Sequence, residues 1–288
     1  MKQGTHQKTI PAQHQTHQPG LESKMSPEPE YIKKDYRSSD RLKNKIAIIT
    51  GGDSGIGRAI SIAYAAEGAN IVIQYLDEDV DAKKTKKLIE EVGRECLLIS
   101  GDLRDEKFCK SIVTKTIKHF GKLDVLVNNA AQQFPHDDFL DIRTSDLMDT
   151  FNVNIVSMFH IIKAALPHLK KGSSIINTAS VTAYRGSDHL IDYSATKGAI
   201  VSLTRSLSKQ LIKKGIYVNA VAPGPIWTPL IASSFPAKEV KKFGTNTPMG
   251  RAGQPSEVSP CYVFLASNDS SYMSGQVLHP NGGEIINT

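Results

Sequence analysis

Cysteine is scarce in this chain, and long apolar runs are missing from it. Only three cysteines occur among 288 residues (Cys96, Cys109 and Cys261), which is too few and too scattered for a disulfide framework or a zinc site. No uninterrupted apolar stretch approaches the roughly 18 residues that a membrane-spanning helix needs. The N-terminal sequence MKQGTHQKTI has no apolar core of the kind found in secretion signals. These features predict a cytoplasmic protein with reduced thiols and no membrane anchor.

The charge balance gives little support to a nucleic-acid partner. Lysine and arginine number 35 against 29 aspartate and glutamate residues, a formal net charge of +6. Residues 1–45 hold nine basic and five acidic residues, so +4 of the excess belongs to them and the remaining 243 residues carry only +2. A domain that binds nucleic acid has its basic residues clustered on one face. We therefore expect no nucleic-acid partner.

Residues 1–40 are predicted to form a polar N-terminal extension. They are rich in glutamine, histidine and proline and show no apolar period, so they are expected to bury too little surface to offset their ordering entropy. His6, His14 and His17 could bind a metal, but no cysteine or acidic cluster joins them. A solvated tail is therefore the favoured interpretation, and ordering against a neighbouring subunit is the alternative.

From Lys45 onward, short β-branched runs alternate with helical stretches. The predicted strands are 45–50, 70–75, 95–100, 123–129, 173–180, 216–223 and 275–280. The predicted helices are 57–68, 79–92, 105–119, 144–169, 192–213, 229–243 and 256–266. Continuous apolar strands between helices indicate a parallel sheet that is covered on both faces. Residues 41–288 are therefore predicted to be α/β, a single doubly wound Rossmann domain with a seven-stranded parallel sheet and helices on both faces.

A glycine-rich turn joins the first predicted strand to the first predicted helix. Glycines in such a turn let the backbone approach a pyrophosphate that sits on the helix N-terminus. The spacing is Gly-x3-Gly-x-Gly rather than the commoner Gly-x-Gly-x2-Gly, and a plain strand-to-helix turn is the alternative. The strand-turn-helix context favours a dinucleotide site made by Gly51, Asp53, Ser54, Gly55, Ile56 and Gly57.

Two further strand ends carry polar groups that suit a dinucleotide. Asp102, followed by Leu103, ends the third strand, where its carboxylate could accept a hydrogen bond from an adenine amino group. The alternative role for Asp102 is the N-cap of helix 105–119. Asn128 and Asn129 end the fourth strand and could hold the central strands together, while the small Ala130 and Ala131 leave space for the cofactor.

Ser180, Tyr193 and Lys197 form the most specific catalytic pattern. Tyr193 and Lys197 are four residues apart in a predicted helix, so they share one face. A free tyrosine has a pKa of about 10, and we expect the Lys197 ammonium to lower it. Ser180 ends the preceding strand and should meet Tyr193 across the cleft. A carbonyl oxygen held between the two hydroxyls would be polarised for hydride attack and then protonated by Tyr193.

These motifs occur in a fixed order along residues 42–284. They are TGGDSGIG at 50–57, GDL at 101–103, NNA at 128–130, Asn154, Ser180, YSATK at 193–197 and PGPIWT at 223–228. As a set they resemble the short-chain dehydrogenase/reductase family. The extension ending in PEPEYIKKDY and the segment PGPIWTPL are similar to a bacterial subgroup of glucose/ribitol dehydrogenase-like and general-stress oxidoreductases.

The resemblance implies roles for further residues. Asn154 would anchor a water that links Lys197 to solvent, and Lys197 would also bind the nicotinamide ribose. The segment with Pro223, Gly224, Ile226 and Thr228 would hold the nicotinamide, with the Ile226 backbone and Thr228 on its carboxamide. Gly282 and Gly283 match a glycine pair near subunit contacts, and family members are usually homotetramers.

The implied function is an NAD(P)-dependent oxidoreductase that needs no metal. It would transfer hydride between a nicotinamide cofactor and the carbonyl/alcohol carbon of a small polar substrate of aldehyde, sugar or polyol type. The alternative is a dinucleotide-binding sensor that keeps the fold without catalysis.

Two departures from the family pattern bear on the cofactor. Ala131 stands where the family usually has glycine, which an ordinary backbone conformation tolerates. Tyr75 stands where NAD-preferring relatives have aspartate, and neither Ser54 nor Leu76 offers the cation that a 2′-phosphate wants. Asp77 and Glu78 would repel that phosphate. We expect NAD, with NADP as the alternative.

The substrate pocket should lie over the carboxyl ends of the strands, near the point where the strand order reverses. Stretch 229–247 is expected to act as a mobile lid. The expected lining is Gln132, Gln133, Thr182, Tyr184, His189 and Trp227, although a surface histidine is more often only solvated.

Overall fold

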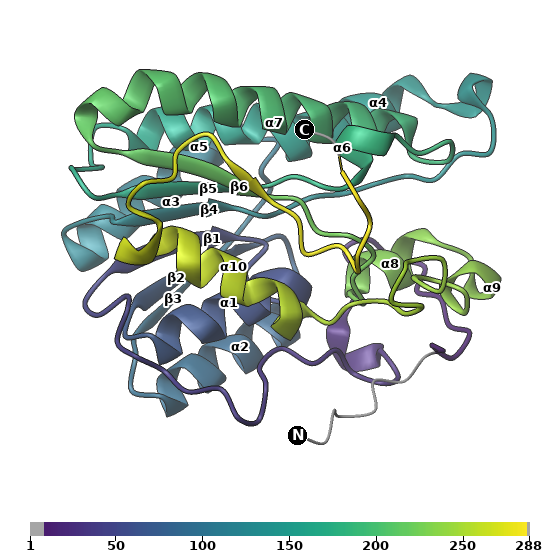
Figure 1. Cartoon of the computed structure of the whole chain (residues 1–288), viewed down its shortest axis with the longest axis horizontal. Helices are drawn as coiled ribbons and strands as arrows, with labels where there is room; N and C mark the ends of the chain where they lie inside the picture. Colours follow the sequence, from purple (N-terminus) through teal and green to yellow (C-terminus); the bar gives the residue numbers. More distant parts are fainter. Residues whose placement is uncertain (1–8, 287–288) are drawn as a thin grey trace.

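The computed structural model describes residues 9–286 and has one seven-stranded sheet at its centre (Figure 1). All neighbouring strands are parallel, in the order β3-β2-β1-β4-β5-β6-β7. This confirms the predicted doubly wound sheet. The strands are β1 Ile46–Thr50, β2 Asn70–Tyr75, β3 Cys96–Ser100, β4 Val125–Asn128, β5 Ser174–Thr178, β6 Tyr217–Val221 and β7 Val277–Leu278.

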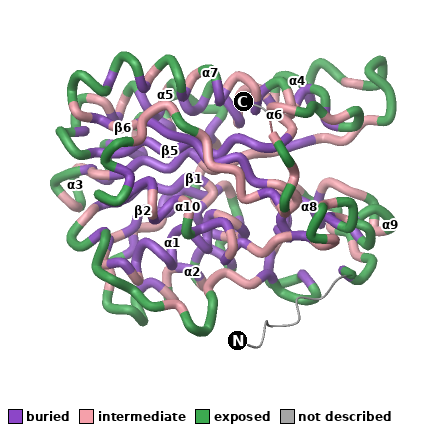
Figure 2. Tube along the Cα trace, viewed as in Figure 1, coloured by how far each residue is buried: buried purple, intermediate pink, exposed green. Residues whose placement is uncertain are grey.

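Helices cover both faces of the sheet because its central strands are apolar on both sides. In β1, Ile49 packs into one hydrophobic cluster and the adjacent Ile48 packs into the other. Figure 2 shows the central strands buried between the two helical layers. One layer contains α1 Gly55–Ala66, α2 Asp79–Glu91 and α10 Pro255–Ala266. The other contains α3 Glu106–Phe120, α5 Ser157–Ala165 and α7 Ile191–Leu211, with α4 Thr144–Phe151 packed against α7.

The order of the strands reverses between β1 and β4, which are neighbours in the sheet. Chain connections leave the carboxyl ends of these two strands in opposite directions, and this leaves a crevice between them. Beside this edge lie the short helices α6 Thr182–Arg185, α8 Pro229–Ser234 and α9 Ala237–Val240. No helix within residues 9–286 is long and apolar enough to cross a membrane.

Two predicted helices are interrupted. The predicted helix 144–169 is divided by a π-helical turn, η3 Asn152–Val156, that separates α4 from α5. The predicted helix 229–243 becomes α8 and α9, because Pro236 keeps the preceding Phe235 in an extended conformation. Short 3-10 turns complete the elements: η1 Glu22–Lys24, η2 Phe139–Asp141, η4 Ile212–Lys214 and η5 Asn268–Ser270.

The N-terminal extension is not a solvated tail, and that prediction is wrong for the described part. Residues 10–30, which we call the N-terminal strap, run along the body beside α8 and α9 (Figure 1, purple). Ile10 and Met25 are buried against Trp227, whose indole Nε1 donates to the Pro27 carbonyl at 2.9 Å. The segment is polar overall, but a few of its groups, such as the Ile10 and Met25 side chains and the Pro27 carbonyl, contact the rest of the protein, and these contacts order it.

The histidines of the extension do not form a metal site within the described residues. The His14 ring pairs with the Phe235 carbonyl at 2.9 Å, and His17 faces Asp77 at 3.5 Å. His6 lies outside the described residues. Clusters of three or more metal-ligating side chains do not occur anywhere between residues 9 and 286.

Residues 36–41 are fixed to the C-terminal end of α1 by Glu67. The buried Glu67 carboxylate accepts hydrogen bonds from the Tyr36 hydroxyl at 2.6 Å, the Arg41 guanidinium at 2.6 Å and the amides of Ser39 and Arg41. Burial raises the pKa of Glu67, but these hydrogen bonds outweigh burial and lower it to about 2. The ionised form of Glu67 therefore stabilises the fold.

The Glu67→Gln variant should show the pH dependence of this contribution. The pKa of Glu67 is lower in the folded than in the unfolded chain, so its stabilisation is full above about pH 5 and is lost as the pH falls toward 2. Denaturant unfolding should show the variant less stable by up to about 3 kcal/mol at pH 7, with the difference shrinking below pH 4.5. A difference that stays constant from pH 7 to pH 3 contradicts this account.

Candidate active site

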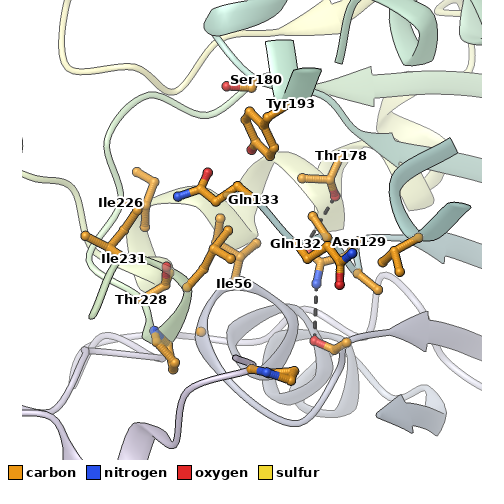
Figure 3. A pocket seen from close by; sticks show the side chains of 18 of the residues that line it. Ile56, Asn129, Gln132, Gln133, Thr178, Ser180, Tyr193, Ile226, Thr228 and Ile231 are labelled. Carbon is orange, nitrogen blue, oxygen red and sulfur yellow. Dashed lines mark hydrogen bonds between the residues drawn. The ribbon is translucent and has the colours of Figure 1, made fainter. Parts of the chain in front are cut away.

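One cavity of about 350 Å³ runs along the carboxyl ends of the central strands. The glycine turn lines one part of it, and Ser180 and Tyr193 line another (Figure 3). The fold thus brings together most of the residues that the sequence pointed to: Gly51, Asp53, Ser54, Gly55, Ile56, Tyr75, Asp102, Leu103, Asn129, Ala130, Ala131, Gln132, Gln133, Ser180, Thr182, Tyr193, Lys197, Pro223, Gly224, Ile226 and Thr228.

The glycine turn has the geometry of a phosphate cradle. Gly51 and Gly55 adopt positive φ angles of 59° and 51°, which favour glycine. Gly57 lies outside the cavity lining, and a Cβ on it would stand 1.8 Å from the Gly51 carbonyl oxygen. The lack of a side chain at Gly57 therefore lets the first turn of α1 pack directly against the Gly51 backbone. The cradle, the helix N-terminus and the continuous cavity fit a dinucleotide pyrophosphate.

Asn129 fixes the glycine turn to β4. Its side-chain amide donates to the carbonyls of Thr50 at 3.1 Å and Gly51 at 3.2 Å, while the Thr50 hydroxyl accepts from the amides of Asn129 and Ala130. The adjacent Asn128 donates to the Asn177 side chain of β5 at 2.9 Å. These contacts are the strand-bridging role expected for the two asparagines.

Two buried carboxyl groups lie at the part of the cavity formed by β2 and the glycine turn. Asp53 and Glu78 both line it and are almost fully buried. Burial, together with the neighbouring Glu78, raises the pKa of Asp53. The side chain of Asp77, by contrast, is 58% exposed and faces His17 outside the cavity lining.

Asp102 lines the cavity, and its carboxylate forms an ion pair with Arg104. The guanidinium of Arg104 donates to both carboxylate oxygens at 2.7–3.1 Å, and these bonds lower the pKa of Asp102. The alternative role of Asp102 as a helix N-cap is wrong, because the cap of α3 is Asp105, which accepts from the Lys107 amide.

Ser180, Tyr193 and Lys197 lie on one wall of the cavity. The Lys197 ammonium donates to the Thr178 carbonyl at 2.8 Å, and its Nζ lies 5.2 Å from the centre of the Tyr193 ring. The Ser180 hydroxyl oxygen accepts from the amide and hydroxyl of Thr182, each at 3.1 Å. Figure 3 shows Ser180 next to Tyr193, with Ile56 and Thr228 further along the cavity.

The expected acidic phenol is not found. Burial raises the pKa of Tyr193 to about 12, more than its hydrogen bond with Ser180 lowers it. Burial also lowers the pKa of Lys197 to about 7. The expectation took account of the ammonium charge but not of burial, which disfavours the charged form of both groups.

Asn154 lies behind the wall rather than in the cavity lining. It is fully buried in the π-helical turn, where its side chain accepts from the Gln132 amide at 2.9 Å and donates to the Gln132 carbonyl and the Thr196 hydroxyl. π-helical turns of this kind occur frequently at functional sites. Asn154 thereby connects the segment after β4 to helix α7, which carries Tyr193.

Three of the residues expected at the substrate do not line the cavity. Trp227 is fully buried against the N-terminal strap, Tyr184 packs edge-on against His279, and His189 is half-exposed beside Asp137. None of the three lines the cavity formed by the described residues. Sequence patterns missed other residues of the lining, Pro19, Gly20 and Leu190, whereas Ile231, Phe235 and Phe243 of the lining belong to the expected lid stretch 229–247.

Comparison with known proteins agrees with this geometry. A family model described as enoyl-(acyl carrier protein) reductase matches residues 51–284. General stress protein 39 of Bacillus subtilis is 56% identical, with 98% of each chain covered. Glucose and ribitol dehydrogenase of Daucus carota is 50% identical, with 96% of this chain and 98% of the relative covered. The same values hold for NADPH-dependent aldehyde reductase 1, chloroplastic, of Arabidopsis thaliana.

Solved structures share the fold as well. A short chain dehydrogenase from Burkholderia cenocepacia J2315, in complex with NADP, has a TM-score of 0.79 at 31% identity, covering 84% of this chain and 98% of that one. A short-chain dehydrogenase/reductase, described as glucose/ribitol dehydrogenase, from Brucella melitensis has a TM-score of 0.76 at 34% identity, covering 86% and 99%. Both the expected family and its expected subgroup are thereby confirmed.

The burial of Lys197 predicts a pH-dependent stability. Its pKa is about 7 in the folded chain against 10.5 for an ordinary lysine, so the unfolded chain binds the additional proton between these values. Stability relative to a Lys197→Met variant should therefore rise by about 1 kcal/mol per pH unit from pH 7 to pH 10. Urea unfolding of both proteins across this range measures it, and parallel pH profiles would contradict it.

Proposed function

Because the chain belongs to the short-chain dehydrogenase/reductase family of oxidoreductases, we propose that it interconverts a carbonyl and an alcohol group on a small polar aldehyde, sugar or polyol. The observation that carries this proposal is the position of Ser180, Tyr193 and Lys197 on a wall of the cavity that also includes the glycine turn. Polar side chains of Gln132, Gln133 and Thr182 lie in the same lining, which suits a hydroxylated substrate.

A nicotinamide dinucleotide bound in this cavity would supply the hydride in the reductive direction and accept it in the oxidative one. Gly51, Gly55 and Ile56 would hold its pyrophosphate, and Pro223, Gly224, Ile226 and Thr228 its nicotinamide end. Tyr193 donates the proton to the substrate carbonyl oxygen in the reductive direction and accepts it in the oxidative one. Its raised pKa keeps the phenol protonated at neutral pH, which is the form that donates.

Two neighbours support Tyr193 in this role. The Ser180 hydroxyl donates a hydrogen bond to the same substrate oxygen and stabilises the charge that develops there. Lys197, fixed by the Thr178 carbonyl, stabilises the phenolate left after proton transfer and binds the nicotinamide ribose. Asn154 would anchor the water through which this lysine exchanges protons with solvent, while its side chain holds Gln132 in place.

NAD is the cofactor that we propose, with NADP as the alternative. The two buried carboxyl groups of Asp53 and Glu78 support this choice, because they can form hydrogen bonds with ribose hydroxyls and supply no cation for a 2′-phosphate. Two similar proteins favour the alternative: the Burkholderia structure is a complex with NADP, and the Arabidopsis relative is named as NADPH-dependent.

The protein is further proposed to be a cytoplasmic homotetramer. The scattered cysteines favour the cytoplasm, and the family resemblance favours the tetramer. Apolar side chains on the outer surface of α4, η3 and α5 support an interface between subunits, since Met148, Val156 and Phe159 are 51%, 37% and 55% exposed.

The Tyr193→Phe variant tests the chemistry. It removes only the proton donor, so turnover should fall by at least about 100-fold while NADH still binds. Tyr184→Phe is the matched control, because this hydroxyl is buried outside the cavity and its loss should leave turnover unchanged. The assay is a screen of aldehydes, sugars and polyols for cofactor oxidation or reduction. Retained turnover in Tyr193→Phe contradicts the mechanism, and a wild-type protein that binds NADH but turns over no substrate favours a sensor.

Separate titrations with NADH and NADPH test the choice of cofactor. NADH should bind at least about tenfold more tightly, since the carboxyl groups of Asp53 and Glu78 offer a 2′-phosphate no cationic partner and each 1.4 kcal/mol of binding free energy lost there costs a factor of ten in affinity. The Asp53→Asn and Glu78→Gln variants should narrow this difference. Tighter binding of NADPH to the wild type would show that the two carboxyl groups do not select the cofactor.

A further inference from the structure

The N-terminal strap contributes directly to the cavity. Pro19 and Gly20 line it, and Gln18 secures this part of the strap to the segment after β4. The Gln18 side chain donates to the Gln133 carbonyl at 3.0 Å and accepts from the Gln133 amide at 3.0 Å. On the other side, the Gln15 amide donates to the Ala232 carbonyl of α8 at 2.8 Å. The strap therefore connects two walls of the cavity.

Glu22 of the strap contacts the glycine turn itself. Its side chain is fully buried, and its carboxylate accepts from the Gly55 amide at 2.6 Å. The same carboxylate forms an ion pair with Arg58, whose side chain is also fully buried. Gly55 is the first residue of α1 and lines the cavity, whereas Glu22 does not. Glu22 therefore holds the turn from the side away from the cavity.

Arg58 extends this contact to both sides of the turn. Its guanidinium donates to the Asp53 carbonyl at 2.9 Å, to the Thr85 hydroxyl at 2.7 Å and to the Asp81 carboxylate at 3.0 Å. Asp81 in turn accepts from the Glu22 amide at 2.7 Å. Arg58 thus fixes the carbonyl of Asp53 and Glu22 fixes the amide of Gly55, and these two backbone groups lie on either side of Ser54.

We propose that the N-terminal strap is part of the dinucleotide-binding machinery, and that Glu22 is a positioning residue that sets the conformation of the glycine turn. This inference rests on the proposed function, because the ligand is the nicotinamide dinucleotide. Residues 18–20 complete the wall of the cavity while Glu22 fixes the backbone that receives the pyrophosphate. The strap thus prepares the site before the ligand arrives, which lowers the ordering cost of binding.

Removing the Glu22 charge should loosen the turn rather than impair the chemistry. A neutral side chain leaves Arg58 with Asp81 as its remaining charged partner and weakens the acceptor of the Gly55 amide. The turn then samples other conformations, and the dinucleotide must select the competent one. Affinity for the dinucleotide should fall while the rate at saturation changes little, since Tyr193 and Ser180 lie on other elements.

Glu22→Gln is the test variant and Glu67→Gln is its matched control. Both carboxylates are fully buried, both receive hydrogen bonds from backbone amides, and they contact opposite ends of α1. Fluorescence titration of the full-length proteins with NADH should show Kd raised by at least about tenfold in Glu22→Gln and unchanged in Glu67→Gln, and thermal unfolding should show both variants destabilised. At saturating cofactor, kcat of Glu22→Gln should stay within about twofold of the wild type.

Several outcomes would overturn the inference. An unchanged Kd in Glu22→Gln, or an equal rise in both variants, would make Glu22 a structural residue only. A wild-type protein that binds neither NADH nor NADPH would instead overturn the proposed function itself. If Glu22→Gln does not fold, hydrogen exchange of the wild type decides: NADH should slow exchange at residues 18–24 as well as at the glycine turn, and slowing at the turn alone contradicts the inference.

Discussion

The burial of Arg58 between two carboxylates is the interaction on which the cofactor half of the molecule depends. One guanidinium contacts the strap, the glycine turn and helix α2 at once. Burying such charges is costly, and it is repaid only when geometry and hydrogen bonding are nearly complete. The requirement for a complete set of partners makes the local arrangement specific, since losing any one partner leaves a charge buried and uncompensated.

The catalytic half depends on burial in a different way. Tyr193 and Lys197 lie in an apolar wall that raises the pKa of the phenol and lowers that of the amine. Near neutral pH the phenol is therefore protonated, and the amine is close to its own pKa. Hydrogen bonds from Ser180 to Tyr193 and from Lys197 to the Thr178 carbonyl fix the positions of the two side chains.

The sequence predicted the sheet, the glycine turn and the catalytic wall because each rests on local signals. Apolar runs give the strands, four-residue spacing places Tyr193 and Lys197 on one helix face, and strand ends collect at one edge. The strap could not be predicted this way. Glu22 finds its partners 33 to 59 residues away, and composition alone makes such a segment resemble a solvated tail. Trp227 was misplaced for the same reason, since its partner carbonyl lies 200 residues earlier.

The long separation between the strap and its partners has a consequence for biosynthesis. Residues 10–30 are synthesised well before some of the groups that hold them, since the Trp227 indole that contacts Pro27 and the Ser256 hydroxyl that contacts Glu30 lie 200 and 226 residues further along the chain. Domains emerge N-terminal part first, and contacts between distant segments form slowly. Glu22 can meet Gly55, Arg58 and Asp81 as soon as the first third of the chain has been made, whereas the contacts of Pro27 and Glu30 must wait until the last quarter is available, so the strap docks in two stages.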